Sequence, residues 1–352
     1  MTSNPVIGIV GATGAVGQIL VSVLGERTFP AGEVRCFASS SSKGKKLVVC
    51  GKEVEVQELS LSGFDDCDIV FFDIPDDLSK QWVPVAAKAG AFVVDNSAAW
   101  RLENGPLVIV PEVNGVMLEE RLKSTSELEW KERIFCCPNC STAQLVVALI
   151  PIERSFGLKK VIVSTYQSVS GAGYLAIDEL KNQVASVLAA EANPDSAKNS
   201  AVAPQSFSHQ IAFNCIPQIG GIGQNGFTSE EMKIINESRL ILNLPNLQIT
   251  ATAVRVPVDY CHGESIFIET AKDFSLNEVF AALGTQAGLR LLLDSEHPMP
   301  INARNEDAVL VGRVRKDEQI DRGLHLWVVA DNLRKGAALN AVQIAEALLK
   351  SK

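Results

Sequence analysis

Cys140 is the residue of this chain whose surroundings best suit nucleophilic catalysis. The apolar segment 133–137 predicts a strand that ends at Pro138, and a helix is predicted to begin near Ser141. Cys140 would then lie at a helix N-terminus, where N–H groups and the helix dipole favour the thiolate over the thiol. The same N–H groups could hold the oxyanion that forms when a thiolate attacks a carbonyl or an acyl phosphate.

Two other interpretations of this cysteine remain open. The chain has eight cysteines, and most cysteines in a protein are inert core residues. The Cys137–Cys140 spacing is also found in zinc sites and redox pairs, but zinc needs four ligands and no second such pair exists. Cys261 and His262 could complete the set, although adjacent side chains on an extended segment point to opposite faces. No metal is therefore expected.

A cysteine nucleophile needs a proton acceptor, and His262 is the candidate with the most informative context. The other histidines are His209, His297 and His325. His262 follows a predicted apolar strand, 249–256, and precedes a glycine that permits close backbone approach. Whether it meets the distant Cys140 depends on the fold.

The elements that would position a cofactor lie at the start of the chain. Residues 6–10 predict a buried parallel strand, a glycine-rich turn follows, and Val16, Leu20, Val23 and Leu24 recur at helical spacing. Glycine lets the backbone approach a pyrophosphate, and the helix N-terminus offers N–H groups to it. The residues expected to bind the cofactor here are Gly11, Thr13, Gly14, Ala15, Val16 and Gly17. The alternative is a glycine turn that binds no ligand.

The strands that follow indicate the class of fold. Further strands are predicted at 33–38, 68–72 and 91–95, with a helix at 80–89. This alternation is typical of a Rossmann-type, doubly wound parallel sheet.

The segment 39–46 bears on which nicotinamide cofactor is used. An NAD site usually has an acidic residue about 20 residues past the glycines, on the ribose hydroxyls. This chain instead has four serines followed by lysines, and hydroxyls and cations suit a 2′-phosphate. Ser41 and Ser42 are therefore expected to contact NADP. The alternative is a flexible polar loop.

Composition restricts the partners and the compartment. The 352 residues suffice for two domains, and the net charge of −9 disfavours nucleic acid and anionic membranes as partners. No apolar run approaches the length that spans a bilayer, and no targeting segment is visible. With its scattered cysteines, the chain is expected to be cytoplasmic.

The remainder of the chain predicts a second, α+β domain. The expected elements are strands at 160–167, 249–256, 265–270, 308–314 and 324–330, helices at 174–190 and 336–350, and a loop at 192–205.

With these residues in view, the whole chain resembles the aspartate-semialdehyde dehydrogenase family. The motifs that carry the resemblance are 138–142 (PNCST), 166–171 (YQSVSG), 255–258 (RVPV), 262–264 (HGE), 95–101 (DNSAAWR) and 332–338 (NLRKGAA). The resemblance implies NADPH-dependent reductive dephosphorylation of L-aspartyl-4-phosphate through a Cys140 thioester, in the biosynthesis of lysine and diaminopimelate, threonine and methionine. It also implies a nucleotide-binding domain made of 1–138 plus 332–352, a catalytic and dimerisation domain at 139–331, and a homodimer or tetramer.

The resemblance also implies roles for individual residues. Cys140 is the nucleophile, His262 the general acid and base, and Gln167 orients the intermediate. Substrate contacts are expected from Arg255 to the α-carboxylate, from Glu230 to the amine, from Lys233 and Arg101 to phosphate, and from Asn139. Ser170, Gly171 and Asn332 would flank the cofactor. Without the resemblance, Glu230 and Lys233 would be an exposed helical ion pair, Arg101 a surface charge, and Gln167 an exposed strand residue.

Two features depart from the family pattern. Ser41 and Ser42 stand where members often have Arg-Ser, so Lys43 or Lys45 would have to supply the cation. The acidic segment 73–77 replaces a small Gly- and Ser-rich loop, and its carboxylates would repel a pyrophosphate unless they face away. The competing functions are an N-acetylglutamyl-phosphate reductase-like enzyme, a catalytically silent nucleotide-binding homologue and a Cys–His hydrolase.

Overall fold

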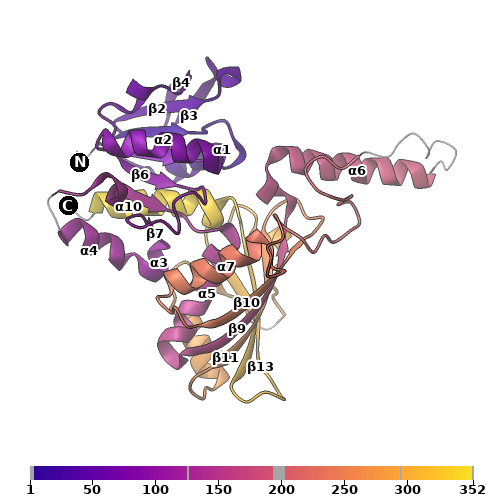
Figure 1. Ribbon diagram of the computed structural model, residues 1–352. Helices are drawn as coiled ribbons and strands as arrows, with labels where there is room; N and C mark the ends of the chain where they lie inside the picture. The colour runs from indigo at the N-terminus through magenta and orange to yellow at the C-terminus, as the bar shows by residue number, and fades with distance from the viewer. Residues whose placement is uncertain (1–3, 125–126, 193–202, 294, 351–352) are drawn as a thin grey trace. The chain divides into compact units, whose positions relative to one another are not determined.

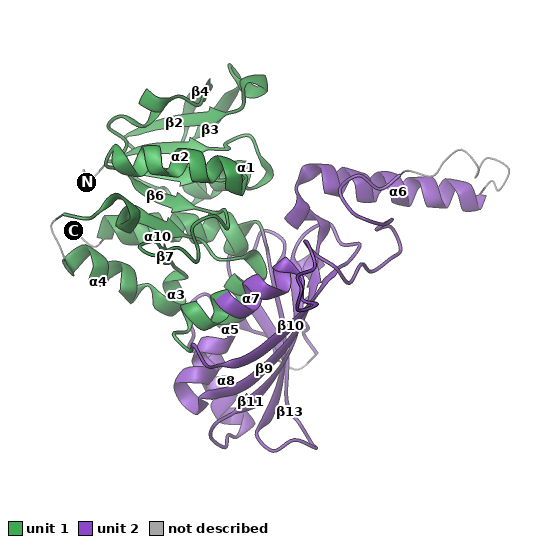
Figure 2. Cartoon of the chain, viewed as in Figure 1, with its two compact units in different colours: residues 1–147, 237–244, 333–352 green, residues 148–236, 245–332 purple. Residues whose placement is uncertain are grey.

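The computed structural model describes residues 4–124, 127–192, 203–293 and 295–350. The chain divides into two compact units (Figure 2). Unit 1 comprises residues 1–147, 237–244 and 333–352, and unit 2 comprises residues 148–236 and 245–332.

Unit 1 is built on an eight-stranded sheet with the order β3-β4-β2-β1-β5-β6-β8-β7. Its strands are β1 (Val6–Val10), β2 (Glu33–Ala38), β3 (Lys46–Val49), β4 (Lys52–Glu58), β5 (Ile69–Phe72), β6 (Phe92–Asp95), β7 (Leu107–Val108) and β8 (Ile134–Cys136). All neighbours pair in parallel except β3 and β4, which form an antiparallel pair that the sequence did not predict. The predicted Rossmann-type class is confirmed.

The helices of unit 1 include α1 (Ala15–Glu26), α2 (Asp76–Lys88), α3 (Pro111–Asn114), α4 (Val116–Ser124) and α10 (Leu339–Lys350). Leu20 and Leu24 of α1 share one buried cluster with Ile7 and Ile9 of β1 and Val342 of α10. The C-terminal helix α10, yellow in Figure 1, accordingly has the same green colour as the N-terminal strands in Figure 2. The two ends of the chain therefore build one core.

Two helix starts differ from prediction. The C-terminal helix was expected to start at Gly336, but the segment Arg334–Ala338 forms a π-helical turn, η6, before α10 begins. Helix α2 begins at Asp76 instead of residue 80, so Asp76 and Asp77 occupy its first turn. Carboxylates are favoured there by the helix dipole, which explains two of the three acids in segment 73–77.

Unit 2 contains a mixed six-stranded sheet with the order β10-β9-β11-β14-β13-β12. Its strands are β9 (Leu158–Gln167), β10 (Gln248–Arg255), β11 (His262–Thr270), β12 (Leu289–Leu291), β13 (Val309–Lys316) and β14 (Gly323–Ala330). The helices include α6 (Tyr174–Ala192), α8 (Leu276–Gly284) and α9 (Pro300–Ala303), while α5 (Cys140–Phe156) and α7 (Ser229–Ile241) each contain a boundary between the units. Most of the predicted loop 192–205 lies outside the described residues.

Strand β11 starts three residues before the predicted strand, so that His262 is its first residue. Cys261 has a φ of 71°, in the left-handed region, so the argument from alternating side chains on an extended segment does not apply to this pair. Cys261 instead packs in an apolar cluster with Leu310 and Val329.

The unit boundaries differ from the predicted domain spans. Residues 139–147 and 237–244 fall in unit 1, and Asn332 falls in unit 2. Side-chain contacts of Glu237 with Asn139 and Arg101 account for the position of the 237–244 segment.

Candidate active site

Cys140 is the first residue of α5, and Asn139 caps this helix. The Asn139 Oδ1 atom accepts hydrogen bonds from the N–H groups of Ser141 at 3.0 Å and Thr142 at 3.3 Å. Asparagine is a favoured residue at this position because its side chain satisfies N–H groups that lack partners in the first turn. These two N–H groups are therefore occupied by the cap, and the expectation that N–H groups of this helix end hold an oxyanion stays a prediction.

Gly336 gives Cys140 the room it needs. A Cβ atom placed on Gly336 would lie 2.7 Å from the Cβ of Cys140, too close for any other residue. Gly336 belongs to η6, so the π-helical turn passes directly beside the nucleophile. The sequence signal for this contact is Gly336 itself, which lies in the 332–338 motif and at the predicted start of the C-terminal helix.

A buried ion pair supports the residue that precedes the cysteine. Arg101 donates from Nη1 to Glu237 Oε1 at 3.0 Å and from Nη2 to the Asn96 carbonyl at 2.7 Å. The other oxygen of Glu237 accepts the backbone N–H of Asn139 at 2.6 Å. Burial alone would lower the pKa of Arg101, but the Glu237 carboxylate outweighs it and the pKa is raised. Arg101 is thus a buried cation and not a surface charge, and Glu237 is a residue that the sequence reasoning missed.

Burial separates Cys140 from most other cysteines of the chain. All eight cysteines are described and free of disulfide bonds. Burial raises the pKa of Cys36 and of Cys67 to about 11 and that of Cys137 to about 12, which keeps them as thiols. Cys140 is only partly buried, so that a substrate can reach it. The described residues contain no cluster of metal-ligating side chains.

In unit 2, three predicted site residues form one row across three neighbouring strands. Gln167 ends β9, and it is paired in register with Arg255 on β10 and with His262 on β11. Side chains in register on adjacent strands share one face of a sheet. All three are buried, so Gln167 is not the exposed strand residue of the alternative interpretation.

Ser168 fixes the two ionisable members of this row. Its carbonyl accepts a hydrogen bond from Arg255 Nη1 at 2.7 Å. Its N–H donates to His262 Nδ1 at 3.1 Å, and its hydroxyl lies 3.1 Å from the same atom. Burial, followed by repulsion from the Arg255 guanidinium, lowers the pKa of His262 to about 3. The imidazole is therefore neutral at physiological pH, and because its Nδ1 atom accepts the Ser168 N–H, the ring proton lies on Nε2.

Glu230 and Lys233 lie on the first turns of α7. Glu230 is buried and its Oε1 accepts a hydrogen bond from Gln167 Nε2 at 3.2 Å, which joins it to the row. Lys233 is 3.8 Å from the other Glu230 oxygen and is partly exposed. The pair is not the exposed ion pair of the alternative interpretation, since its acidic member belongs to the buried site.

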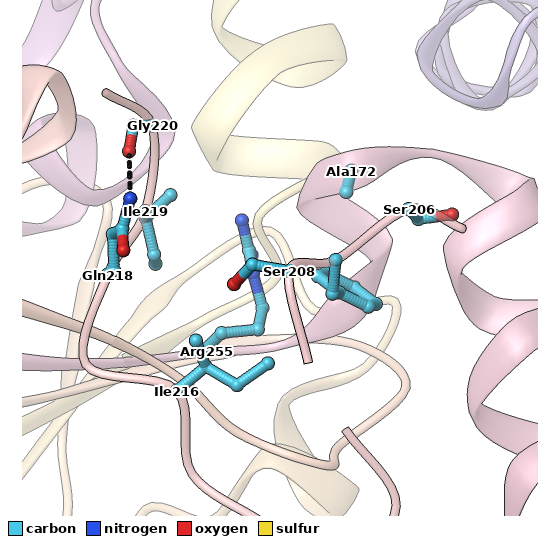
Figure 3. Close-up of a pocket in the computed structure, with 9 residues that line it drawn as sticks. Ala172, Ser206, Ser208, Ile216, Gln218, Ile219, Gly220 and Arg255 are labelled. Atoms are coloured by element: carbon cyan, nitrogen blue, oxygen red, sulfur yellow. Dashed lines mark hydrogen bonds between the residues drawn. The ribbon is translucent and has the colours of Figure 1, made fainter. Parts of the chain in front are cut away.

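A cavity of about 300 Å³ opens beside Arg255. Figure 3 shows the Arg255 side chain extending into it, with Ser208 and Ile219 beside the guanidinium. The lining residues are Ala172, Ser206, Phe207, Ser208, Ile216, Gln218, Ile219, Gly220 and Arg255. The Glu179 carboxylate on α6 holds this wall by accepting the N–H groups of Gln205 and Ser206. A cation in a polar cavity of this size suits a small carboxylate.

The glycine turn of unit 1 has the geometry of a phosphate cradle. A Cβ atom on Gly17 would lie 2.2 Å from the Gly11 carbonyl oxygen, and one on Gly11 would lie 2.1 Å from the Asp73 carbonyl oxygen. Only glycine therefore fits at either position. The turn leads into α1, whose first residue is Ala15, so the N–H groups at this helix end face the place where a pyrophosphate would bind.

The serine segment lies against this turn. Thr13 Oγ1 and Ser42 Oγ are 3.3 Å apart, and Lys45 Nζ donates to Ser42 Oγ at 3.2 Å. Lys43 instead lies 3.6 Å from the Glu58 carboxylate. Of the two lysines proposed to replace the missing arginine, Lys45 is the one beside the turn. These residues fit a phosphorylated dinucleotide.

The remaining predicted cofactor residues form a group in unit 2. Asn332 Oδ1 accepts from Ser170 Oγ at 3.1 Å, from Ser168 Oγ at 3.2 Å and from the N–H of Cys261 at 2.9 Å. Gly171 adjoins the catalytic row, because a Cβ atom there would lie 3.1 Å from Arg255 Nη1 and 3.3 Å from His262 Nε2.

The predicted site residues thus fall into two sets. Unit 1 holds Gly11, Thr13, Gly14, Ala15, Val16, Gly17, Ser41, Ser42, Arg101, Asn139 and Cys140, and unit 2 holds Gln167, Ser170, Gly171, Glu230, Lys233, Arg255, His262 and Asn332. Cys140 and His262 belong to different units, so their encounter stays a prediction. Over the part of the chain that is described, none of the helices has the length and apolar character needed to cross a membrane.

A nucleotide-binding sheet that carries a thiol at a helix start, combined with a mixed-sheet unit that carries a buried imidazole, defines a semialdehyde dehydrogenase type of protein. The model of the semialdehyde dehydrogenase NAD binding domain matches residues 6–121, and that of the semialdehyde dehydrogenase dimerisation domain matches residues 149–335.

Comparison with individual relatives shows which semialdehyde dehydrogenases the chain is most similar to among those compared. The chain is 45% identical over 348 residues to aspartate-semialdehyde dehydrogenase of Aquifex aeolicus, covering 98% of each chain. It is 43% identical to that of Bacillus subtilis, covering 98% of this chain and 97% of the relative. The crystal structure of aspartate semialdehyde dehydrogenase II of Vibrio cholerae, complexed with ASA, matches with a TM-score of 0.90 and 41% identity over 99% of both chains. The chain belongs to the aspartate-semialdehyde dehydrogenase family, whose members are NADP-dependent oxidoreductases of amino-acid biosynthesis.

Proposed function

We propose that this chain converts L-aspartyl-4-phosphate and NADPH into L-aspartate 4-semialdehyde, NADP and phosphate, a step in the biosynthesis of lysine and diaminopimelate, threonine and methionine. The observation that carries the proposal is Cys140. It stands at the start of α5, capped by Asn139 and accommodated by Gly336, in a chain 45% identical to an enzyme of this name.

The chemistry proceeds through a thioester on Cys140. The Sγ thiolate attacks the carbonyl carbon of the acyl phosphate, the bond from that carbon to the phosphate oxygen breaks, and phosphate leaves with the bonding pair. NADPH, when bound, supplies the hydride that reduces the acyl group. Breaking of the carbon–sulfur bond then releases the aldehyde and returns the thiolate. His262, neutral in the resting protein, is the general acid and base of the reaction.

The substrate is held by charged groups of opposite sign. Arg255 binds the α-carboxylate in the cavity beside it, and arginine suits this task because its planar guanidinium matches a carboxylate with two hydrogen bonds. Glu230 binds the amine, and Gln167, hydrogen-bonded to Glu230, orients the acyl group. Lys233 and Arg101 bind phosphate, and Asn139 contributes through its position beside Cys140.

The cofactor binds on the glycine turn, with residues 11–17 at the pyrophosphate and Ser41 and Ser42 at the 2′-phosphate. Lys45 supplies the cation of this subsite through its contact with Ser42. Ser170, Gly171 and Asn332 flank the nicotinamide. Unit 1 then binds NADP and carries Cys140, and unit 2 supplies His262, Gln167 and the dimerisation surface.

The match to a dimerisation domain at 149–335 supports a homodimer, and a tetramer is the larger assembly to consider. Light scattering after gel filtration distinguishes them by mass. The cytoplasmic location remains a prediction from the eight free cysteines.

The decisive assay runs the reaction in reverse. The chain is incubated with aspartate semialdehyde, phosphate and NADP, and reduced nicotinamide is followed by absorbance. Reduction of NADP with aspartate semialdehyde but not with N-acetylglutamate semialdehyde supports the proposal. The opposite selectivity would identify the reductase-like alternative, and no reduction of NADP with either semialdehyde would indicate a silent homologue. Replacing NADP with NAD tests the serine segment.

A further inference from the structure

Asp73 occupies an unexpected place for an acidic residue, directly under the glycine turn. It follows β5, and its N–H donates to the Val10 carbonyl at the end of β1 at 3.0 Å. A Cβ atom placed on Gly14 would lie 3.7 Å from the Asp73 Oδ2 atom. The carboxyl group therefore faces the N-terminus of α1. Asp76 and Asp77 differ from it, because they lie in the first turn of α2 and are exposed.

Among the described residues, the groups that act on the Asp73 carboxyl include no cation. The turn 11–17 carries no charged side chain, and β6 contributes the buried carboxyl of Asp95, which accepts hydrogen bonds from the Ser79 and Ser97 hydroxyls. Burial raises the pKa of Asp73 to about 6, with a further increase from Asp95, although the Gly17 N–H and the Asn96 amide act in the opposite direction. The carboxyl thus changes charge close to physiological pH.

The same N–H group would serve two anions. The Gly17 N–H that stabilises the Asp73 carboxylate belongs to the helix end at which a cofactor pyrophosphate binds. The Asp73 carboxylate and the pyrophosphate would repel each other at this site, and protonation of the carboxyl group removes the repulsion. Asn96 is suited to the neutral form, because its Oδ1 atom is buried without a partner among the described residues and could accept an O–H.

We propose that Asp73 is a proton-linked residue of the cofactor site, which accepts NADPH only as the neutral carboxylic acid, so that binding takes up one proton from solvent. The inference rests on the proposed function, since it requires the glycine turn to hold the cofactor. It gives the chain a cofactor affinity that weakens as pH rises.

The size of the effect follows from the fraction of neutral acid. With a pKa of about 6, roughly one molecule in ten is neutral at pH 7 and one in a hundred at pH 8. An affinity that depends on a minor form is reduced by the fraction of that form. The dissociation constant of NADPH is therefore expected to increase about fivefold from pH 6 to pH 7 and about tenfold from pH 7 to pH 8.

The test is calorimetric titration of the full chain with NADPH at pH 7, in buffers of different ionisation enthalpy, together with dissociation constants from pH 6 to 8. Wild type should take up close to one proton. D73N should take up none and bind about a hundredfold more tightly than wild type at pH 8, but only about twofold more tightly at pH 6. D77N removes a nearby exposed charge and should behave like wild type.

Several outcomes would overturn the inference. The 2′-phosphate of NADPH titrates near pH 6, and its binding as the dianion would release protons. Proton uptake by wild type has the opposite sign and therefore cannot come from the 2′-phosphate. This measurement is informative even if the D73N variant does not fold. Binding of NADPH without proton uptake, or weaker binding by D73N at pH 8, would overturn this inference alone. Failure of wild type and both variants to bind NADPH would overturn it together with the proposed function.

Discussion

The glycine turn of unit 1 and the catalytic row of unit 2, formed by Gln167, Arg255 and His262, position their functional groups in different ways. The turn is made of backbone from seven consecutive residues, and its shape follows from where a Cβ atom is absent. The row is made of side chains from three strands, which come together because Gln167 is in register with Arg255 and His262. A local site of backbone tolerates changes of side chain except at its glycines. A site built by register depends on charge, burial and every strand that supports it.

Loss of the nucleophile is the strongest test of the shared reaction. The Cys140→Ser variant should lose a factor of about 10⁴ or more in kcat, because an alcohol is a far weaker nucleophile than a thiolate. Initial rates measure the loss, and unchanged NADPH binding serves as the control for folding. A variant with wild-type kcat would refute the thioester mechanism.

Within the catalytic row, removal of the imidazole should have the next largest effect. His262→Gln preserves a polar side chain in register with Gln167 but cannot act as a general acid or base, and kcat should fall by about 10² to 10⁴. The rate of Cys140 alkylation against pH gives a second measurement, since its profile should shift only if the two residues meet. An unaltered profile and kcat would separate His262 from the chemistry.

The buried ion pair between Arg101 and Glu237 in unit 1 tests how much side-chain charge contributes to stability and substrate binding outside the catalytic row. Glu237→Gln leaves Arg101 without its carboxylate, and breaking a buried pair should cost about 3 kcal/mol of unfolding free energy. It should also raise KM for phosphate more than KM for aspartate semialdehyde. Glu346→Gln is the matched control, because its pair with Arg27 is partly exposed and should contribute less than about 1 kcal/mol. Equal losses in both variants would contradict the role of Glu237.

The backbone site is probed with two glycines near or within α1. Gly17→Ala places a methyl group 2.2 Å from the Gly11 carbonyl, so the turn must shift and NADPH should bind at least about tenfold more weakly, roughly 1.4 kcal/mol. In the Gly25→Ala variant the added Cβ atom would have no neighbour within 4 Å. This variant should stabilise the helix by about 0.5–1 kcal/mol and leave NADPH binding unchanged. Similar affinities of the two variants would show that the turn does not hold the cofactor.

The smallest expected effect is the acid sensitivity contributed by His262. Its pKa is about 3 in the folded chain and about 6.5 when unfolded, so the unfolded state binds the proton first as pH falls. The unfolding free energy should therefore decrease below pH 6.5 by up to about 1.4 kcal/mol per pH unit, and His262→Gln should remove this part of the slope. Denaturant titrations at pH 6.5 and 5.5 measure it. Identical slopes for both proteins would show that the imidazole is not buried in neutral form.

Much of unit 1 could be predicted because its signals are local. The sequence determined β1 and β2 to the residue, the glycine turn between β1 and α1, and a cysteine at a helix start, since each depends on side-chain pattern over about ten residues. It also identified His262 from its local context, and Arg255 and Gln167 through family motifs.

Tertiary structure alone decided how these residues act. The sequence could not place Gln167 between Arg255 and His262, turn Glu237 toward Arg101 and Asn139, or bring Gly336 against Cys140, because these contacts join segments up to about 200 residues apart. The residue pattern alone could not distinguish a buried Arg101 from a surface charge, since burial is a property of the whole fold. Local pattern selects the elements, whereas register, burial and the electrostatics that follow from them arise only when distant elements pack together.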